Sequence, residues 1–396
     1  MARKQASAAD AALIAATGEC GAAPTPTQLE RWRAGGLLPR NVQHGAGQGR
    51  GSVSTVPPGA VELAIWLTAH ARPGRRPDDL ALEAFAAGLP VPEPTVRAAL
   101  VAASTDFRLD VPPEPDTGAM VGRSDWIAEV AQEYAAEHGG RSVLLPRRIR
   151  DIDARIAGAG IPFALPELAP FDKGTYDTEP YTSRDLLTTA VAAVLGGTSE
   201  LAEGDLAAIS RAMAPPGAAV PIASMLEYPD DAPRLADIND GHGLTLLPAG
   251  DAREELKRVI AEASLAQLRA AWQAVDEMQR WAVSLCDAVE AELDGLAAKQ
   301  PLPAYPGLHG WFIGITFGLN RMLLRLALIE PEPTTKARAA TAMMLLNMAT
   351  GMSRLRVMLP DSRFDLMPQL LPPFLQHLDE LVAANLPVSL RPSKVV

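Results

Sequence analysis

Apolar residues recur every three or four positions along most of this chain, the spacing of α-helices that bury one face. Alternating patterns typical of β-strands are scarce. The pattern predicts a mainly α-helical fold. In the amino-terminal half the expected helices cover residues 8–16, 26–34, 60–70, 77–87, 94–103, 125–138, 146–157, 183–195 and 203–213.

The strongest helical pattern runs over residues 251–299, which predicts one helix about 70 Å long if it is straight. Helices over 307–329, 334–358 and 366–384 should follow and pack with it as a bundle. The most apolar stretch, 308–329, contains His309, Asn320, Arg321 and Arg325, which the centre of a bilayer would penalise. We therefore expect a buried helix there and no membrane span.

Prolines divide the chain into an expected series of domains. Residues 110–117 hold three prolines, which suit neither a helix nor the interior of a sheet. We expect an amino-terminal domain over 1–107, a linker over 108–122, a helical middle region over 123–250 and a helical bundle over 251–396. Residues 215–250 should form a long loop within the middle region.

The first forty residues contain signals for a helix, a turn and a second helix. Thr25 is a good N-cap residue, Pro26 suits the first helical position, and Gly35-Gly36 should end the helix. Residues 41–55 are polar and glycine-rich around Arg50 and precede another helix. Such a segment can fold as a small wing.

Charge is distributed unevenly along the chain. Residues 1–77 hold nine basic and four acidic side chains, a net charge of +5, whereas the whole chain carries −11. A basic amino-terminal domain on an acidic body is an expected layout for a DNA-binding protein with a separate assembly or regulatory domain.

The segment from Thr25 to Pro39 resembles the DNA-binding domain of MerR-family regulators. Its matching residues are Thr25, Pro26, Leu29, Trp32, Gly36, Leu37, Leu38 and Pro39. The resemblance covers about residues 8–103 and implies a winged helix-turn-helix there. It also implies a homodimer that regulates transcription at an inverted repeat in double-stranded DNA. The large carboxy-terminal helical bundle is predicted by the helical pattern alone. The composition, rich in Ala, Arg, Pro and Gly and poor in Lys, is typical of a GC-rich bacterial genome, and the two separate cysteines fit a reducing, cytoplasmic environment.

In this interpretation the recognition helix, about residues 26–34, enters the major groove, and the wing, about 41–55, contacts the DNA backbone. Thr27, Gln28 and Arg31 would face the bases, while Arg33, Arg40 and Arg50 would neutralise phosphates. The backbone amides at Thr25, the indole of Trp32 and the hydroxyl of Ser52 would add further contacts. The expected DNA-binding residues are Thr25, Thr27, Gln28, Arg31, Trp32, Arg33, Arg40, Arg50 and Ser52.

Three positions depart from this expectation or allow another role. Glu30 stands where the family commonly has a basic residue, and Val56 replaces the usual contact residue of the wing. Trp32 could instead be a core residue. The alternative function is a helical interaction module whose degenerate winged helix binds a partner protein.

Other chemistry is poorly supported by the sequence. Cys20 and Cys286 suggest no disulfide framework or zinc site, and residues 237–242 do not complete a calcium loop. The usual catalytic motifs are absent, so we expect no enzyme, no cofactor and no metal.

Two further clusters have a structural and a functional interpretation. Five arginines could form a solvated helix face or a second DNA contact: Arg141, Arg147, Arg148, Arg150 and Arg155. Large apolar residues of the carboxy-terminal domain could be plain core or line a pocket for a small-molecule or protein effector. They are Trp272, Met278, Trp281, Trp311, Phe312, Phe317 and Met322.

Overall fold

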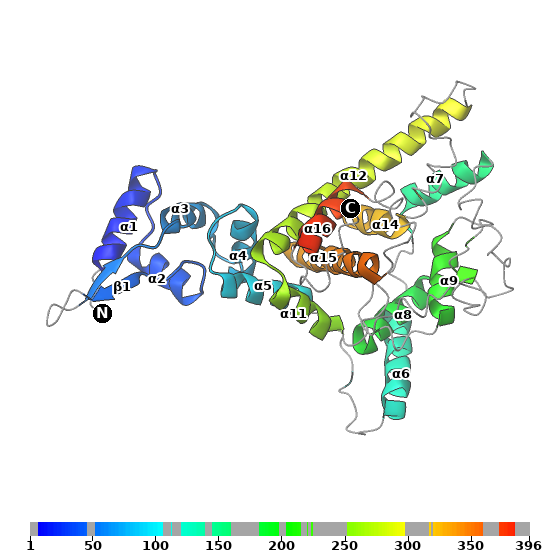
Figure 1. The fold of residues 1–396 in the computed structure, drawn as a ribbon, viewed down its shortest axis with the longest axis horizontal. Helices are drawn as coiled ribbons and strands as arrows, with labels where there is room; N and C mark the ends of the chain where they lie inside the picture. Colours follow the sequence, from blue (N-terminus) through cyan, green and yellow to red (C-terminus); the bar gives the residue numbers. More distant parts are fainter. Residues whose placement is uncertain are drawn as a thin grey trace. The chain divides into compact units, whose positions relative to one another are not determined.

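The fold is mainly α-helical, as the sequence predicted (Figure 1). A computed structural model describes residues 7–45, 52–105, 112, 120–138, 145–159, 182–197, 203–214, 220, 223–224, 252–297, 317, 320–358 and 372–384. Within these ranges the chain forms fourteen α-helices and one two-stranded antiparallel sheet.

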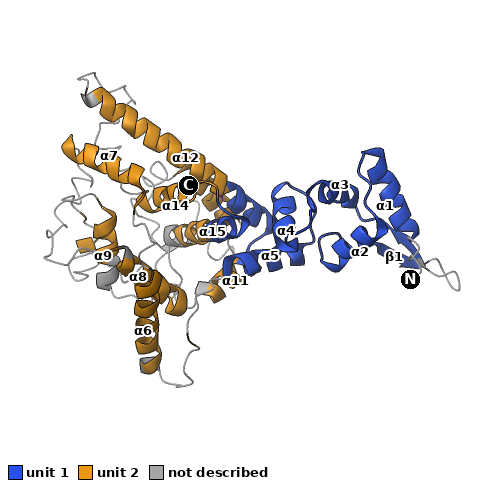
Figure 2. Ribbon diagram, turned by 180° about the vertical axis from the view of Figure 1, so that it is seen from behind, with its two compact units in different colours: residues 1–106, 260–273, 333–343 blue, residues 107–259, 274–332, 344–396 orange. Residues whose placement is uncertain are grey.

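The chain divides into two compact units (Figure 2). Unit 1 comprises Met1–Asp106, Ile260–Gln273 and Pro333–Met343, and unit 2 comprises Phe107–Val259, Ala274–Glu332 and Met344–Val396. The sequence pattern suggested a separate bundle over 251–396. The structure instead divides that region between the two units, because parts of three carboxy-terminal helices belong with the amino-terminal residues.

Unit 1 begins with α1 (Ala8–Glu19) and α2 (Pro26–Ala34). Strands β1 (Val42–Gly45) and β2 (Ser52–Thr55) follow as an antiparallel hairpin, in which Val42 pairs with Thr55 and Gly45 with Ser52. The next helices are α3 (Ala60–His70), α4 (Pro77–Ala86) and α5 (Glu93–Thr105). Their apolar faces form a common core that includes Leu13, Leu29, Trp32, Leu38, Leu63, Leu67, Phe85 and Leu100.

Both ends of α2 are fixed by local hydrogen bonds. At the start, the Thr25 hydroxyl accepts from the Gln28 amide at 3.2 Å, and the Gln28 side-chain oxygen accepts from the Thr25 amide at 2.8 Å. This reciprocal capping box satisfies two amides that the helix itself leaves unpaired. At the end, the Leu37 amide donates to the Trp32 carbonyl at 2.8 Å.

Gly36 makes the turn after α2 possible. Its φ is +72°, in the left-handed region that a residue with a Cβ rarely adopts. A Cβ at this position would also lie 2.5 Å from the Thr95 hydroxyl, which donates to the Gly36 carbonyl at 2.9 Å. The turn therefore joins α2 to α5.

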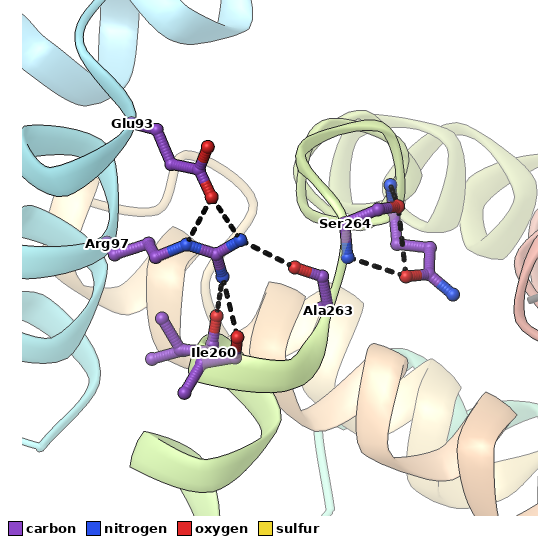
Figure 3. Close-up of polar contacts among 7 residues, drawn as sticks. Glu93, Arg97, Ile260, Ala263 and Ser264 are labelled. Carbon is purple, nitrogen blue, oxygen red and sulfur yellow. Dashed lines mark hydrogen bonds and ion pairs between the residues drawn. The ribbon is translucent and has the colours of Figure 1, made fainter.

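The single helix expected over residues 251–299 is wrong, because the structure breaks it into α11 (Ala252–Glu262) and α12 (Leu265–Ala297). Ser264 and Gln267 form a second capping box, with Ser264 N donating to Gln267 Oε1 at 2.8 Å. On the other side of the break, Arg97 donates to the carbonyls of Ile260 and Ala263 (Figure 3).

Arg97 thus satisfies carbonyls at the end of α11 that a continuous helix would have bonded internally. Glu93, one turn earlier on α5, accepts from Arg97 at 2.6 Å and fixes the direction of the guanidinium. The apolar periodicity continues across the break. It therefore gave no sign of the interruption, although the Ser-x-x-Gln spacing did.

The described helices of unit 2 are α6 (Met120–His138), α7 (Arg147–Gly158), α8 (Ser183–Gly196), α9 (Glu203–Met213), most of α11 and of α12, α14 (Arg321–Ile329), part of α15 (Thr335–Met358) and α16 (Pro373–Ala384). Helix α6 packs against α8. It begins at Met120, so the linker expected over 108–122 overlaps its first turn. Most of that linker, and the long loop apart from residues 220 and 223–224, lie outside the described residues.

A buried ion pair lies inside unit 2. Asp153 on α7 accepts two hydrogen bonds from Arg321 on α14, both at 2.6 Å, and the two side chains are only 5% and 6% exposed. Arg321 also donates through Nε to the Met213 carbonyl at the end of α9. The pair therefore links three helices. No helix in the described ranges is long and apolar enough to cross a membrane.

Candidate nucleic-acid interface

One face of α2 is open to solvent, and the opposite face belongs to the core. Thr27, Glu30, Arg31 and Ala34 are exposed, three or four positions apart, so they form one continuous surface of the helix. Leu29 lies on the buried side. The capping box at Thr25 and the turn at Gly36 hold this exposed face in a fixed orientation within unit 1.

Two of the expected DNA contacts already serve the start of α2. Thr25 uses its hydroxyl and Gln28 its side-chain carbonyl in the capping box. The Gln28 side chain is half-buried, whereas Thr27 between them is exposed. Thr27 is therefore an exposed polar residue of the first turn that the capping box does not use.

Arg33, which was predicted to neutralise a DNA phosphate, has a structural role within unit 1. Its guanidinium lies 2.6 Å from Asp10 on α1 and donates to Asn41, just before β1, at 3.1 Å. The side chain is only 14% exposed. Arg33 therefore ties α1, α2 and the start of the hairpin together.

Asp10 is held ionised by this cluster. Burial alone would raise the pKa of its carboxyl, but hydrogen bonds with Ser7, Arg33 and Asn41 and the charge of Arg33 together lower that pKa below its ordinary value. The ion pair between α1 and α2 is consequently intact at neutral pH.

Trp32 is a core residue, as the alternative interpretation of the sequence held. Only 2% of it is exposed, so its indole cannot serve as the predicted DNA contact. The aromatic position that helped to carry the family resemblance is explained here by packing.

The remaining expected contacts lie near or on the hairpin. Arg40 is exposed just before β1. Ser52 is the first residue of β2, and Arg50 lies outside the described residues. Val42 and Val53 are exposed at 44% and 56%, so the hairpin presents apolar as well as polar side chains.

A cleft beside α2 is lined by Arg31 and by two further arginines that the sequence analysis did not predict as DNA contacts. It has a volume of about 360 Å³, and its lining includes Gln28 and Arg31 of α2 together with Arg72 and Arg75 of the turn between α3 and α4. We call it the arginine cleft. Arg75 forms an ion pair with Glu83, whereas neither Arg31 nor Arg72 has a side-chain partner among the described residues. The signal in the sequence was the basic turn at residues 72–76 between two helices.

The second arginine cluster is largely occupied by ion pairs within unit 2. Arg148 pairs with Asp287 and Glu290 on α12, and Arg155 lies 2.5 Å from Asp294. The hydrogen bond with Glu290 is the main reason that the pKa of Arg148 is raised. Together these contacts favour a structural role for Arg148 and Arg155 over a second DNA contact. Arg141 lies outside the described residues.

The aromatic and methionine residues of the expected effector pocket differ in their surroundings. Met278 and Phe317 are buried, Trp281 packs edge-on against Phe374 at 5.7 Å, and Met322 is 37% exposed. Trp311 and Phe312 lie outside the described residues, as does the 237–242 segment. The described residues contain no group of side chains suited to a metal ion.

The two cysteines differ in their surroundings. Cys20 is exposed at the end of α1, and Cys286 is buried on α12. Burial raises the pKa of the Cys286 thiol to about 11, so it remains protonated and unreactive at neutral pH.

Comparisons with protein-family models, with curated proteins and with solved structures found no match to this chain.

Proposed function

We propose that this protein is a sequence-specific DNA-binding transcriptional regulator that reads the major groove with α2 and contacts the backbone with the β1–β2 hairpin. The observation that carries the proposal is the exposed face of α2. Thr27 and Arg31 lie one turn apart on that face, and the helix is held at both ends by hydrogen bonds. Such a preorganised, polar helix face followed by a hairpin fits recognition by a winged helix-turn-helix.

Each exposed residue has a distinct role in this proposal. Arg31 donates to base edges, for which guanine is the preferred partner of arginine. Arg40, next to the hairpin, neutralises a phosphate and carries no sequence information. The positive charge of residues 1–77 supports binding to a polyanion. The protein acts as a homodimer in this proposal, each copy reading one half of an inverted repeat.

Equilibrium binding to a DNA duplex over a series of salt concentrations tests these roles. Arg31→Ala should weaken binding by about 1–3 kcal/mol and relax discrimination between sites. Arg40→Ala should weaken binding to all sequences equally and reduce the slope of log K against log salt by about 0.9. Arg280, an exposed arginine on α12 in unit 2, supplies the control: Arg280→Ala removes the same charge and should change neither quantity. Equal effects of all three variants would contradict the proposal.

The second candidate is a module that binds a partner protein with the same surface. Two observations favour it: Glu30 lies beside Arg31 on the exposed face of α2, and Val42 and Val53 are exposed on the hairpin. A carboxylate on the recognition face opposes DNA phosphate, and exposed apolar side chains suit a protein surface. This candidate predicts weak DNA binding that does not depend on Arg31.

A further inference from the structure

The arginine cleft has the size and the mixed lining of a small-molecule site. Its volume of about 360 Å³ lies within the range of ligand pockets, about 300–1,000 Å³. Its basic residues come from α2 and from the turn between α3 and α4. Apolar lining comes from Trp32 of α2, from Leu37 just after it, from Leu80 of α4, and from Pro73 and Pro77.

The charge of the cleft points to an anion. Arg31 and Arg72 both line it without a side-chain partner among the described residues. Arg75 adds a third guanidinium group. Its ion pair with Glu83 fixes the orientation of the Arg75 side chain. Guanidinium groups bind carboxylates and phosphates through paired hydrogen bonds. Two or more guanidinium groups around one cleft therefore favour the binding of a carboxylate or a phosphate.

We propose that the arginine cleft binds a small organic anion, a phosphate monoester or carboxylate with a compact apolar body. The anionic group pairs with Arg31 and Arg72, and the apolar body lies against the exposed Pro73 and Pro77 of the lining. Gln28 offers a neutral hydrogen-bonding side chain on the same wall. Inorganic phosphate would satisfy the arginines but leave the apolar lining uncovered.

The site has a regulatory consequence, which rests on the proposed DNA-binding function. Arg31 belongs both to the cleft and to the exposed face of α2. A guanidinium that holds the ligand is withdrawn from DNA, so ligand and DNA oppose each other. The opposition is reciprocal, because the coupling free energy between two binding events is the same in both directions.

Ligand-observed NMR titration of the full chain with phenyl phosphate tests the site directly. We expect saturable binding, at least about tenfold weaker in Arg72→Ala, since that variant loses a charge-assisted hydrogen bond. Arg72 is exposed in a turn, so its replacement should leave the fold intact. Arg280→Ala should bind as the unchanged chain does. Inorganic phosphate, which lacks the apolar body, should bind at least about tenfold more weakly.

Equal binding of phenyl phosphate to the unchanged chain and Arg72→Ala, or no saturable binding, would overturn the site. Equal affinity for inorganic phosphate would overturn the organic ligand class. A DNA titration then separates the two proposals: phenyl phosphate should weaken DNA binding by the unchanged chain and have little effect on Arg72→Ala. If the ligand binds through Arg72 but the chain binds no DNA, the site stands and the proposed function fails. If Arg72→Ala impairs DNA binding while phenyl phosphate does not bind, the cleft holds a DNA phosphate instead and the small-molecule proposal is refuted.

Discussion

In the buried pair Asp153–Arg321, removing one charge alone should destabilise unit 2 strongly, whereas removing both charges together should cost much less than the two single losses combined. The two side chains are 5% and 6% exposed and are joined by two hydrogen bonds of 2.6 Å. Asp153→Leu leaves the Arg321 guanidinium buried without its carboxylate, and Arg321→Met leaves the Asp153 carboxylate buried without its cation. Each single change should therefore lower the free energy of unfolding by about 3–5 kcal/mol.

The double variant should be much less damaged than the sum of the two single variants. With both charges gone, neither desolvation penalty remains, and apolar side chains of similar size can fill the space among Ile149, Ile152 and Ile156. The Met213 carbonyl loses its hydrogen bond from Arg321, which costs about 1 kcal/mol. The expected coupling energy is therefore several kcal/mol in favour of the double variant.

Urea unfolding monitored by circular dichroism, with all four chains compared, measures this coupling. A control cycle at Arg147 and Asp151 uses the same residue types on the same helix, where the side chains are 87% and 65% exposed. That cycle should give a coupling of no more than about 0.5 kcal/mol. If the effects at Asp153 and Arg321 add to within about 0.5 kcal/mol, the reasoning about the buried pair is refuted.

Three further predictions concern local structure. Gly36→Ala should lower the free energy of unfolding by about 1–2 kcal/mol or more, because of its positive φ and the approach of Thr95. Gly18→Ala, in open space within α1, should not lower it in the same thermal melt, and equal losses would contradict this explanation. Ser264→Ala should cost about 1 kcal/mol in urea unfolding and loosen the first turn of α12, seen as faster amide hydrogen exchange there; unchanged exchange would show that the capping box does not matter. Because the pKa of Asp10 is lowered on folding, its stabilising effect is complete above the unfolded pKa of about 4 and is lost as pH falls through the lower folded value. The stability advantage over Asp10→Asn should therefore shrink below about pH 4, and an advantage unchanged between pH 7 and pH 3 would contradict it.

Much of the helical structure followed from local signals in the sequence. Thr25, Pro26 and the glycine pair at 35–36 fix the ends of α2, and each acts through a hydrogen bond or a backbone angle within a few residues. Apolar spacing likewise found α3 and α9 at their observed bounds. Such features depend on near neighbours, so a sequence can reveal them.

Features that depend on distant partners were missed. The role of Arg33 is set by Asp10, and the role of Arg97 is set by the carbonyls at the end of α11. The sequence around each arginine does not indicate these partners. Asp153 was a partial exception. It lies among the isoleucines of the apolar face of α7, and a carboxylate on such a face needs a buried partner. Its position could have indicated an ion pair but not that Arg321 supplies it.

The most direct test of the central claim is sequencing of genomic DNA fragments retained by the purified full chain at near-physiological salt. Arg31→Ala is run beside it, with Arg280→Ala as the charge-matched control. Sequence-specific binding through α2 predicts an enriched inverted-repeat motif that is kept by Arg280→Ala and lost or blurred by Arg31→Ala. The absence of any enriched motif would contradict the claim and favour a protein partner. The same motif in the unchanged chain and in both variants would also contradict it and would favour another DNA-contacting surface.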